Sequence, residues 1–467
     1  MPVKNNQIKQ QLEVLINSPS SEEIFFLDQN NVMKYGALRA SINKLSKILS
    51  SKKEIKRFAI VTNSIASVLV ALCACLKTSK IPVLLPSTSY NFLTESIGYF
   101  DEILTDNEDP ALNKFKRTVF ARTQNFAHDH EEKVTFPEVL PDISLFTSGS
   151  SGESKRIRKK VSTMLQEGYL LKDFLFERYP DLMHSGMCIA ASVTARHLYG
   201  LTFSVFLPLI CKIRIYQQRI RFTEELVQLK DPLIFVSSPA FLKRIDCSLK
   251  PPRILLTVCA GGTLDEQDAD EYITWSNSEL LDIYGSTETG IIAYKIKNSN
   301  QKGWTLFKGM RLTPSNFNFT LSSELLDGEL TVSDRITLLE DGSFILKGRS
   351  DDIVKIEEKR ISLNEIKQSL LKLPGIKDAE CIPYIHKKRT FIAALIILDP
   401  PTRRLFEENR TGMIINWRKK LLFSLIETAV PRKFTIIDTF YENENGKRPR
   451  AMLERLLLEK RNERKLV

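Results

Sequence analysis

The sequence is poor in the residues from which disulfide frameworks and metal sites are built, with seven cysteines and five histidines among 467 residues. The cysteines are odd in number and scattered, and several lie in apolar surroundings such as GMCIAAS, which favours reduced, buried thiols. Cys73 and Cys75 are one residue too close for a Cys-x-x-Cys site. His128 and His130 could share a metal ion, but their acidic stretch AHDHEE favours an exposed loop. Composition therefore gives no support to a disulfide-stapled or zinc-dependent class.

Long apolar runs are also missing. The most apolar stretch, IASVLVALCACL at 65–76, is too short to span a bilayer and ends at Lys77, so it predicts a buried helix. The N-terminal stretch at 1–18 spaces its apolar residues as on one helix face and lacks the unbroken apolar segment of a signal peptide. We therefore predict a cytoplasmic protein without a membrane span.

The charge balance is basic rather than acidic, with a formal net charge of +11. Residues 352–467 carry 25 Lys and Arg against 16 Asp and Glu, so most of the surplus belongs to the last quarter of the chain. A basic segment can bind nucleic acid, but here acids are interleaved with the bases and no stacked aromatic pattern accompanies them, so we expect no nucleic-acid partner. An acidic protein or a phosphorylated ligand suits this segment.

The order of patterns along the chain predicts two domains. Up to residue 320, helical patterns alternate with short β-branched runs such as RFAIVT, IPVLLP and LIFVSS, which predicts an α/β fold with largely parallel, buried strands. Residues 321–346 read as short antiparallel strands with a turn at 340–342, and after residue 348 the pattern becomes that of an α+β module. We therefore predict an N-terminal domain at 1–350 and a C-terminal domain at 351–467.

One polar stretch, FTSGSSGESK at 146–155, has a composition that cannot pack a core. It is either a plain loop or an anion cradle, in which glycines let backbone N–H groups converge, hydroxyls add donors and Lys155 adds charge. It is not a Walker A loop, because Gly149 and Gly152 are only three residues apart. This stretch alone does not decide between a loop and an anion site.

Three further stretches follow it in order: DIYGSTETG at 282–290, SDR at 333–335 with GRSDDIVKIEEKRISL at 348–363, and ENENGKRPR at 442–450. With these four motifs in this order, the chain resembles the adenylate-forming superfamily of acyl-CoA synthetases, nonribosomal adenylation domains and luciferases, over nearly its whole length. It is most similar to stand-alone acyl- or aryl-acid ligases that serve carrier proteins, of the aryl polyene type. The implied fold is a large α/β adenylation domain with a small β-barrel-like subdomain, followed by a small mobile α+β domain.

The resemblance implies that the loop at 147–155 holds the β- and γ-phosphates of ATP through hydroxyls and backbone N–H groups. The phosphate-binding residues would be Thr147, Ser148, Gly149, Ser150, Ser151, Gly152 and Lys155, with Thr287 from the second motif. Glu288 would help to hold Mg²⁺, an oxygen-seeking ion that bridges phosphates.

The same resemblance implies a nucleoside site. Tyr284 would stack on the adenine, and Gly261 and Gly262 would let the backbone approach that ring closely. Asp334 would accept both ribose hydroxyls, with Arg349 assisting. These five residues come from four separate stretches of the chain.

The implied catalytic residue is Lys447, whose flexible ammonium would stabilise the charge that grows on the carboxylate and α-phosphate oxygens. Without the other motifs it would read as a solvated surface lysine. Asp351 would be the hinge about which the small domain rotates, and Arg360 would contact a phosphate in one of its orientations. His197 would lie near the substrate carboxylate, with a structural histidine as the competing interpretation.

The implied reaction joins a carboxylic acid, aryl or fatty, to ATP as acyl-AMP with release of pyrophosphate, and then transfers the acyl group to a thiol. We expect the phosphopantetheine of an acidic acyl carrier protein, supplied in trans, to be the acceptor. The first alternative is free coenzyme A, whose phosphates the basic C-terminal domain would also attract. An alternative of another class is a non-catalytic protein that binds an acyl-adenylate or a carrier.

Three positions depart from the pattern of this superfamily. Ser154 replaces the usual proline of the phosphate loop, which should loosen the loop without removing a donor. Glu358 replaces a glycine beside the thiol tunnel, where a bulky anion would hinder the pantetheine or reshape its path. Ala260 replaces a frequent serine at a position whose contacts to adenine are largely backbone.

Overall fold

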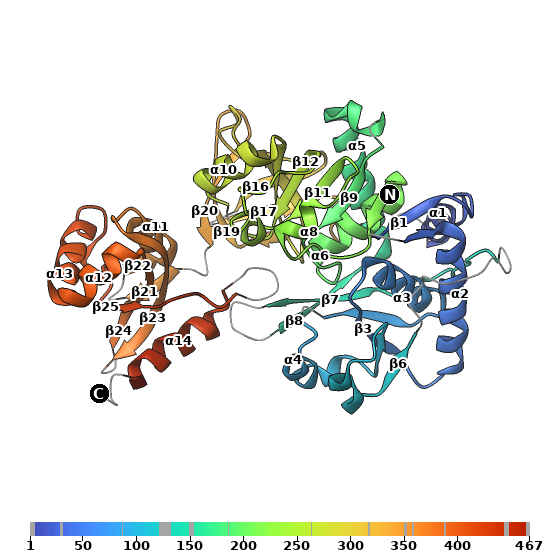
Figure 1. Ribbon diagram of the computed structural model, residues 1–467, viewed down its shortest axis with the longest axis horizontal. Coiled ribbons are helices and arrows are strands. Elements are labelled where there is room, and N and C mark those ends of the chain that lie inside the picture. Colours follow the sequence, from blue (N-terminus) through green and yellow to red (C-terminus); the bar gives the residue numbers. More distant parts are fainter. Residues whose placement is uncertain are drawn as a thin grey trace.

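The computed structural model describes residues 5–28, 31–85, 87–120, 132–148, 154–184, 186–262, 264–315, 318–349, 353–356, 359–386, 389–442 and 448–463. Its N-terminal elements form the larger part of the molecule, and the elements from β21 onward lie to one side of it (Figure 1). Several positions discussed above fall outside the described residues: His128, His130, the connection at 149–153 and the junction at 350–352. The predicted boundary at 350/351 therefore stays a prediction.

A nine-stranded sheet carries the second motif. Its strand order is β15-β14-β13-β12-β11-β9-β10-β1-β2. The strands are β1 (Ile24–Leu27), β2 (Val32–Lys34), β9 (Cys188–Ala191), β10 (Arg214–Tyr216), β11 (Leu233–Ser237), β12 (Ile254–Ala260), β13 (Glu279–Ser286), β14 (Gly290–Ile296) and β15 (Thr305–Leu306). Strands β13 to β1 pair in parallel, and the edge strands β14, β15 and β2 pair antiparallel.

A six-stranded sheet carries the first motif, in the order β6-β5-β3-β4-β7-β8. Its strands are β3 (Arg57–Val61), β4 (Ile81–Leu84), β5 (Glu102–Thr105), β6 (Arg117–Val119), β7 (Ile143–Ser148) and β8 (Ser154–Lys159). All neighbours are parallel except β7 and β8, which form an antiparallel hairpin. The polar stretch at 149–153 is the connection of this hairpin.

Helices cover both faces of these sheets (Figure 1). They are α1 (Asn5–Asn17), α2 (Tyr35–Ser51), α3 (Ile65–Lys77), α4 (Tyr90–Glu95), α5 (Val161–Arg178), α6 (Leu198–Leu201), α7 (Leu207–Cys211), α8 (Thr223–Val227), α9 (Pro239–Leu242) and α10 (Glu266–Ser276). Single 3-10 turns occur at η1 (Ile97–Tyr99), η2 (Pro110–Lys114) and η3 (Pro180–His184), and the segment η4 (Thr202–Phe206) joins α6 to α7 as a π-helix.

Side-chain alternation explains why the strands read as continuous apolar runs. In β9, Ile189 and Ala191 enter the large core between the two sheets, whereas Cys188 and Ala190 enter a second core beneath α10. Both faces of the strand are therefore buried, as is typical of parallel sheets between helices. The apolar stretch at 65–76 is the buried helix α3, as predicted.

Two small antiparallel sheets follow the large one, where the barrel-like subdomain was expected. They are β16 (Arg311–Ser315), β17 (Asn318–Ser322) and β18 (Leu330–Val332), and then β19 (Asp334–Leu338) with β20 (Phe344–Arg349). The predicted turn at 340–342 joins β19 to β20, with Gly342 at a φ of +79°. This positive φ explains the glycine there.

The C-terminal part has apolar clusters of its own. Its elements are β21 (Ile353–Ile356), β22 (Lys359–Ser362), α11 (Leu363–Leu371), β23 (Ile376–His386), β24 (Arg389–Leu398), α12 (Pro400–Glu408), α13 (Arg410–Leu421), η5 (Glu427–Ala429), β25 (Lys433–Ile436) and α14 (Arg450–Glu463). The predicted α/β class with an α+β C-terminal module is thus confirmed. Helix α12 begins at the two prolines 400–401, after the N-cap Asp399, and α13 ends at Leu421.

All seven cysteines are free, and five of them are buried. Of the other two, Cys211 is half-buried and Cys247 is exposed on the loop after α9. Within the described ranges, none of the helices has the length and apolar character needed to cross a bilayer.

Candidate nucleotide and acid site

The second motif lies at the end of β13, where it meets β19. The hydroxyl of Tyr284 donates a 2.6 Å hydrogen bond to Oδ2 of Asp334. The Tyr284 ring is also held from two sides, 5.7 Å from Trp304 and 5.9 Å from Phe344 between ring centroids. The structure thus brings together the two residues predicted to hold the adenine and the ribose, which are 50 positions apart.

The turn that follows Tyr284 has a fixed shape. A Cβ on Gly285 would lie 2.2 Å from the carbonyl oxygen of Gly290, so only glycine fits this close approach of β13 to β14. Ser286 and Thr289 close the turn reciprocally: the Ser286 N–H donates to the Thr289 hydroxyl at 3.1 Å, and the Thr289 N–H donates to the Ser286 hydroxyl at 3.2 Å. Thr287 and Glu288 lie between these two residues, half-buried at the tip.

Gly261 and Gly262 follow directly on β12. Because Ala260 is the register partner of Ile283, Gly261 comes level with Tyr284 on the neighbouring strand. Gly261 has a φ of +95°, and both glycines are exposed. Because glycines have no side chain, this backbone beside Tyr284 leaves room for the flat face of an adenine ring, as predicted for the two residues.

Asp334 begins β19 and pairs in register with Arg349, the last residue of β20. The two predicted ribose-binding residues are therefore neighbours on one antiparallel ladder. The next residue, Arg335, donates from Nη2 to the Lys347 carbonyl at 3.0 Å and to the Ser362 hydroxyl at 3.3 Å. Ser362 is the N-cap of α11, so this bond joins the nucleoside side of the site to the C-terminal module.

The first motif lies on the β7–β8 hairpin. Thr147 pairs in register with Lys155, and Ser148 pairs with Ser154. The Lys155 side chain is exposed. The rest of the predicted phosphate loop lies outside the described residues, namely Gly149, Ser150, Ser151 and Gly152. Both ends of that loop therefore lie at one edge of the six-stranded sheet, on β7 and β8.

A lysine that the motif did not single out joins the first motif to the second. Lys159, the last residue of β8, is buried, and its ammonium donates a 2.9 Å hydrogen bond to the backbone carbonyl of Glu288. Burial lowers the pKa of Lys159, and the charges of Glu167, Glu288 and Asp327 act against that shift. No local sequence pattern identifies this contact, because the two residues are 129 positions apart.

His197 is the N-cap residue of α6 and is half-buried. Two residues later, the Tyr199 hydroxyl donates a 2.8 Å hydrogen bond to the Val258 carbonyl in β12. This bond fixes the helix after His197 against the strand that leads to Gly261. The predicted acid-side residue and the predicted adenine-side glycines are therefore carried by elements in direct contact.

Asp282 was not predicted as a site residue, although it lies two positions before Tyr284. It is buried, and its Oδ1 has no hydrogen-bond partner among the residues that the structure describes. Burial raises the pKa of its carboxyl to about 7, although Lys297 and Lys295 act in the opposite direction. The burial of this acid at the first position of the second motif is a signal that only the structure reveals.

The C-terminal module contributes an anchor next to the predicted catalytic lysine. Arg448 forms a two-pronged contact with Asp378, at 2.9 Å and 2.6 Å, and also donates to Glu380 at 3.1 Å. These contacts raise the pKa of the guanidinium further above its ordinary range. Lys447 itself lies outside the described residues, so the structure gives the position of its neighbour alone.

Other predicted positions are untested. Asp351 and Glu358 lie outside the described residues. Arg360 lies on β22, in register with Lys355 of β21, and its side chain is not described. The roles assigned to these residues stay predictions.

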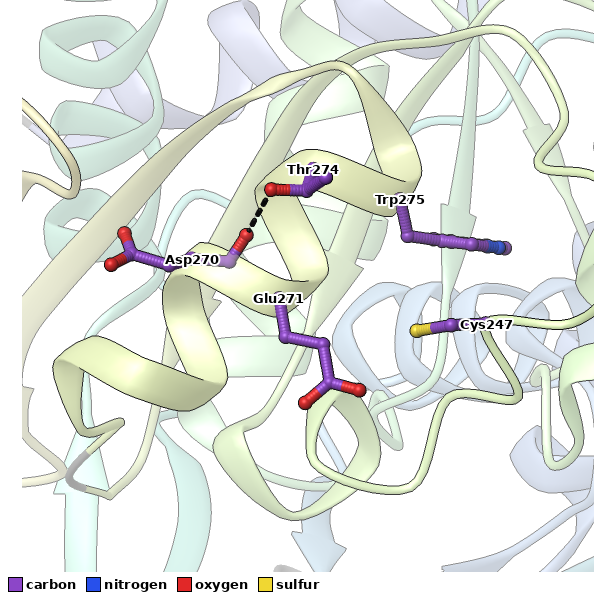
Figure 2. Close-up of a pocket in the computed structure, with 5 residues that line it drawn as sticks. All are labelled: Cys247, Asp270, Glu271, Thr274 and Trp275. Carbon is purple, nitrogen blue, oxygen red and sulfur yellow. Dashed lines mark hydrogen bonds between the residues drawn. The ribbon is translucent and has the colours of Figure 1, made fainter.

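A hollow of about 390 Å³ lies elsewhere on the large part, between α10 and the loop after α9. Figure 2 shows Cys247 on the loop opposite the α10 side chains. The hollow is lined by Cys247, Asp270, Glu271, Thr274 and Trp275. None of the predicted site residues appears among these described lining residues, so the hollow is separate from the candidate nucleotide site.

The contact between Tyr284 and Asp334 leads to a first prediction. Tyr284→Phe keeps the ring and removes the hydroxyl, so we expect the KM for ATP to rise about 2- to 10-fold, the equivalent of one hydrogen bond, with kcat little changed. Tyr294→Phe is the matched control. Tyr294 lies on the adjacent strand β14, its side chain is on the face of the sheet opposite to that of Tyr284, and it packs on Phe174 and Phe307. Equal KM values for the two variants would contradict a role for the Tyr284 hydroxyl.

Comparisons with known proteins show what the chain is similar to. No protein-family model matches the chain. It is 24% identical to 4-coumarate–CoA ligase of Cereibacter sphaeroides over 54% of this chain and 58% of that protein, so the match spans little more than half of that relative. It is 22% identical to acetyl-coenzyme A synthetase 1 of Candida albicans over 92% of this chain and 77% of that one. With D-alanine–D-alanyl carrier protein ligase of Lactococcus lactis it shares 22% identity over 77% and 74% of the two chains.

Solved structures extend the likeness of fold to nearly the whole chain. ATP-bound MatB from Rhodopseudomonas palustris superposes with a TM-score of 0.75 over 97% of this chain and 99% of that one, at 14% identity. A benzoate CoA ligase from Burkholderia xenovorans gives a TM-score of 0.70 over 96% and 99%, at 16% identity. The resemblance drawn from the four motifs is thereby confirmed: the chain is similar in sequence to CoA ligases and to a carrier-protein ligase, and it has the fold of the CoA ligases among the solved structures.

Proposed function

We propose that the chain is an AMP-forming acid–thiol ligase, which activates a carboxylic acid with ATP and passes the acyl group to a thiol. The observation that carries this proposal is the convergence of Tyr284, Asp334 and Gly261 beside the turn that presents Glu288. The named relatives are CoA ligases and a carrier-protein ligase, which supports the same reaction class.

In the first step, a carboxylate oxygen of the acid attacks the α-phosphorus of ATP. The new bond is the acyl–phosphate C(=O)–O–P bond, and the bond between the α-phosphorus and the β-phosphate oxygen breaks, so pyrophosphate leaves. Both reactants are anions, so the site must offset their mutual repulsion. The hydroxyls and amides at 147–152, Lys155 and Lys447 would supply hydrogen-bond donors and positive charge, and Asp334 with Tyr284 would hold the nucleoside.

Magnesium fits this donor set. The half-buried Glu288 gives one carboxylate at the tip of a turn whose backbone Lys159 holds, and phosphate oxygens would complete the coordination, as is usual for Mg²⁺. When bound, the ion would neutralise phosphate charge. The described residues include no cluster of three or more potential metal ligands. We therefore propose that Glu288 would share the ion with the phosphates of ATP, and that protein groups alone would not complete its coordination.

In the second step, a thiolate sulfur attacks the carbonyl carbon of the acyl-adenylate. The C–S bond forms and the C–O bond to AMP breaks, so AMP leaves with its oxygen. We propose the phosphopantetheine of an acidic carrier protein as the acceptor, because residues 352–467 carry the basic surplus. Free coenzyme A stays the alternative, and the CoA ligases among the relatives favour it. A comparison of the two acceptors at equal concentration decides between them.

The test of the main proposal is exchange of labelled pyrophosphate into ATP, measured with a broad panel of aryl and fatty acids. We expect exchange that depends on one class of acid and on Mg²⁺, because adenylation is reversible. If no acid supports exchange while Mg·ATP still binds, the chain is a non-catalytic binder. Aryl acids are the first expectation, on the resemblance to ligases of the aryl polyene type, and medium-chain fatty acids are the second.

A further inference from the structure

Two buried, oppositely charged side chains lie beneath the candidate site. Lys159 at the end of β8 is 5% exposed, and Glu167 within α5 is 2% exposed. Burial lowers the pKa of Lys159 and raises the pKa of Glu167, while the charge of each group opposes the shift of the other. Charged groups are seldom buried this deeply unless each has a partner and hydrogen bonds. Here each group accepts or donates hydrogen bonds, and the opposite charge of the other acts on its pKa, so the contacts of each group show what it holds in place.

Glu167 joins two segments that approach the site from different sides. Its Oε1 accepts a 2.7 Å hydrogen bond from the hydroxyl of Thr202, and its Oε2 accepts a 3.1 Å hydrogen bond from the N–H of Ile291. Thr202 begins the segment η4, directly after the short helix that His197 caps. Ile291 follows the turn that presents Thr287 and Glu288. One carboxylate therefore connects the predicted acid side of the site to the predicted phosphate side.

Lys159 connects a third segment. It ends the strand that leaves the predicted phosphate loop, and its ammonium donates to the Glu288 carbonyl at 2.9 Å. Among the residues that the structure describes, it makes no hydrogen bond to the segment after His197. The lysine therefore acts on the nucleotide side, whereas the glutamate acts on both sides.

Gly290 shows that the turn is built around this carboxylate. A Cβ at this position would lie 2.0 Å from Oε2 of Glu167, and the residue has a φ of +76°. The positive φ favours glycine, and any larger residue would displace the Glu167 carboxylate from this position. The last glycine of DIYGSTETG thus makes room for the side chain of Glu167, 123 residues earlier in the chain.

We propose that Lys159 and Glu167 are positioning residues that couple the acid-binding segment to the turn that holds magnesium and ATP. This inference rests on the proposed function. Neither residue touches a reacting atom; each acts through the backbone it fixes. Groups that orient ligand-bearing residues in this way commonly change affinity or activity by about 10- to 100-fold when they are removed.

The test uses the full-length chain with Lys159→Met, Glu167→Gln and the double variant. Calorimetric titration measures the Kd of Mg·ATP, and exchange kinetics measure the KM values for ATP and for the acid. We expect Lys159→Met to raise the Kd and KM of ATP about 10- to 100-fold with the acid KM little changed. Glu167→Gln should raise the KM for both substrates, because Glu167 contacts both segments.

The double variant separates positioning from stability. Removing both charges leaves no uncompensated buried ion, so its melting temperature should return toward the wild-type value. Its affinity for Mg·ATP should stay weak, because the bond to the Glu288 carbonyl is still missing. Lys160→Met is the matched control: Lys160 is the adjacent residue, its side chain is 52% exposed and it pairs with Asp327 on the surface. This control should bind Mg·ATP as the wild type does.

Wild-type affinity in the double variant would overturn the proposal, as would single variants that lose melting temperature and keep wild-type Kd and KM values. These results differ from a failure of the proposed function. A wild-type chain that binds Mg·ATP but exchanges no pyrophosphate would refute the ligase activity, and the calorimetric comparison of the variants would still test the pair.

Discussion

Replacing Lys447 by alanine is expected to lower the rate of acid-dependent pyrophosphate exchange by a factor of about 10²–10³, while ATP binding is largely kept. The reason is that an ammonium in this position would stabilise charge that exists only in the transition state. A group of that kind affects kcat more than substrate binding. Exchange rates at saturating ATP, together with the Kd of Mg·ATP, measure the two effects separately.

Lys419→Ala is the matched control for this variant. Lys419 is an exposed lysine on α13 of the same module, so its loss changes the net charge equally and should leave exchange unchanged. Turnover of Lys447→Ala at the wild-type rate would remove the assigned role. Equal losses in both variants would attribute the effect to the overall charge of the module.

Arg448 gives this prediction structural support. Its two-pronged contact with Asp378 and its further bond to Glu380 attach the residue after Lys447 to β23. A flexible lysine beside a fixed arginine loses less conformational freedom when it engages a ligand than one in an unanchored loop. The lysine would therefore move with the module rather than independently of it.

The sequence was most informative about segments and least informative about the side chains that hold them together. Gly261, Tyr284 and Asp334 lie at or beside strand ends. Small, aromatic and acidic residues in short polar runs at such places can be recognised from the sequence alone. Their convergence was expected, and the Tyr284–Asp334 bond shows it for that pair. Such runs carry a local composition signal that buried strand interiors lack.

Lys159 and Glu167 show why the rest was out of reach. Each lies in an ordinary strand or helix pattern, and each makes a hydrogen bond to a backbone group more than 120 positions away. A lysine or glutamate in such a pattern reads as solvated surface until tertiary packing buries it.

The largest effect on stability is expected for Asp282→Asn. The buried carboxyl has a pKa of about 7 in the folded chain against 3.8 in its ordinary state, so the folded chain binds more protons between these values. Folding stability that is present below pH 4 is therefore lost as pH rises toward 7. The full loss is on the order of 4 kcal/mol above pH 8. Asparagine cannot ionise and should escape this loss.

We therefore expect Asp282→Asn to be more stable than the wild type by an amount that grows by about 2 to 3 kcal/mol between pH 5 and pH 8. Urea unfolding of the ligand-free protein at both pH values measures it. Asp270→Asn removes an exposed carboxylate from α10 and should show no such growth. A difference between Asp282→Asn and the wild type that is the same at both pH values would mean that the carboxylate is ionised and compensated in the fold. In that case the positive charges of Lys297 and Lys295, which lower the pKa of Asp282, would outweigh the effect of its burial.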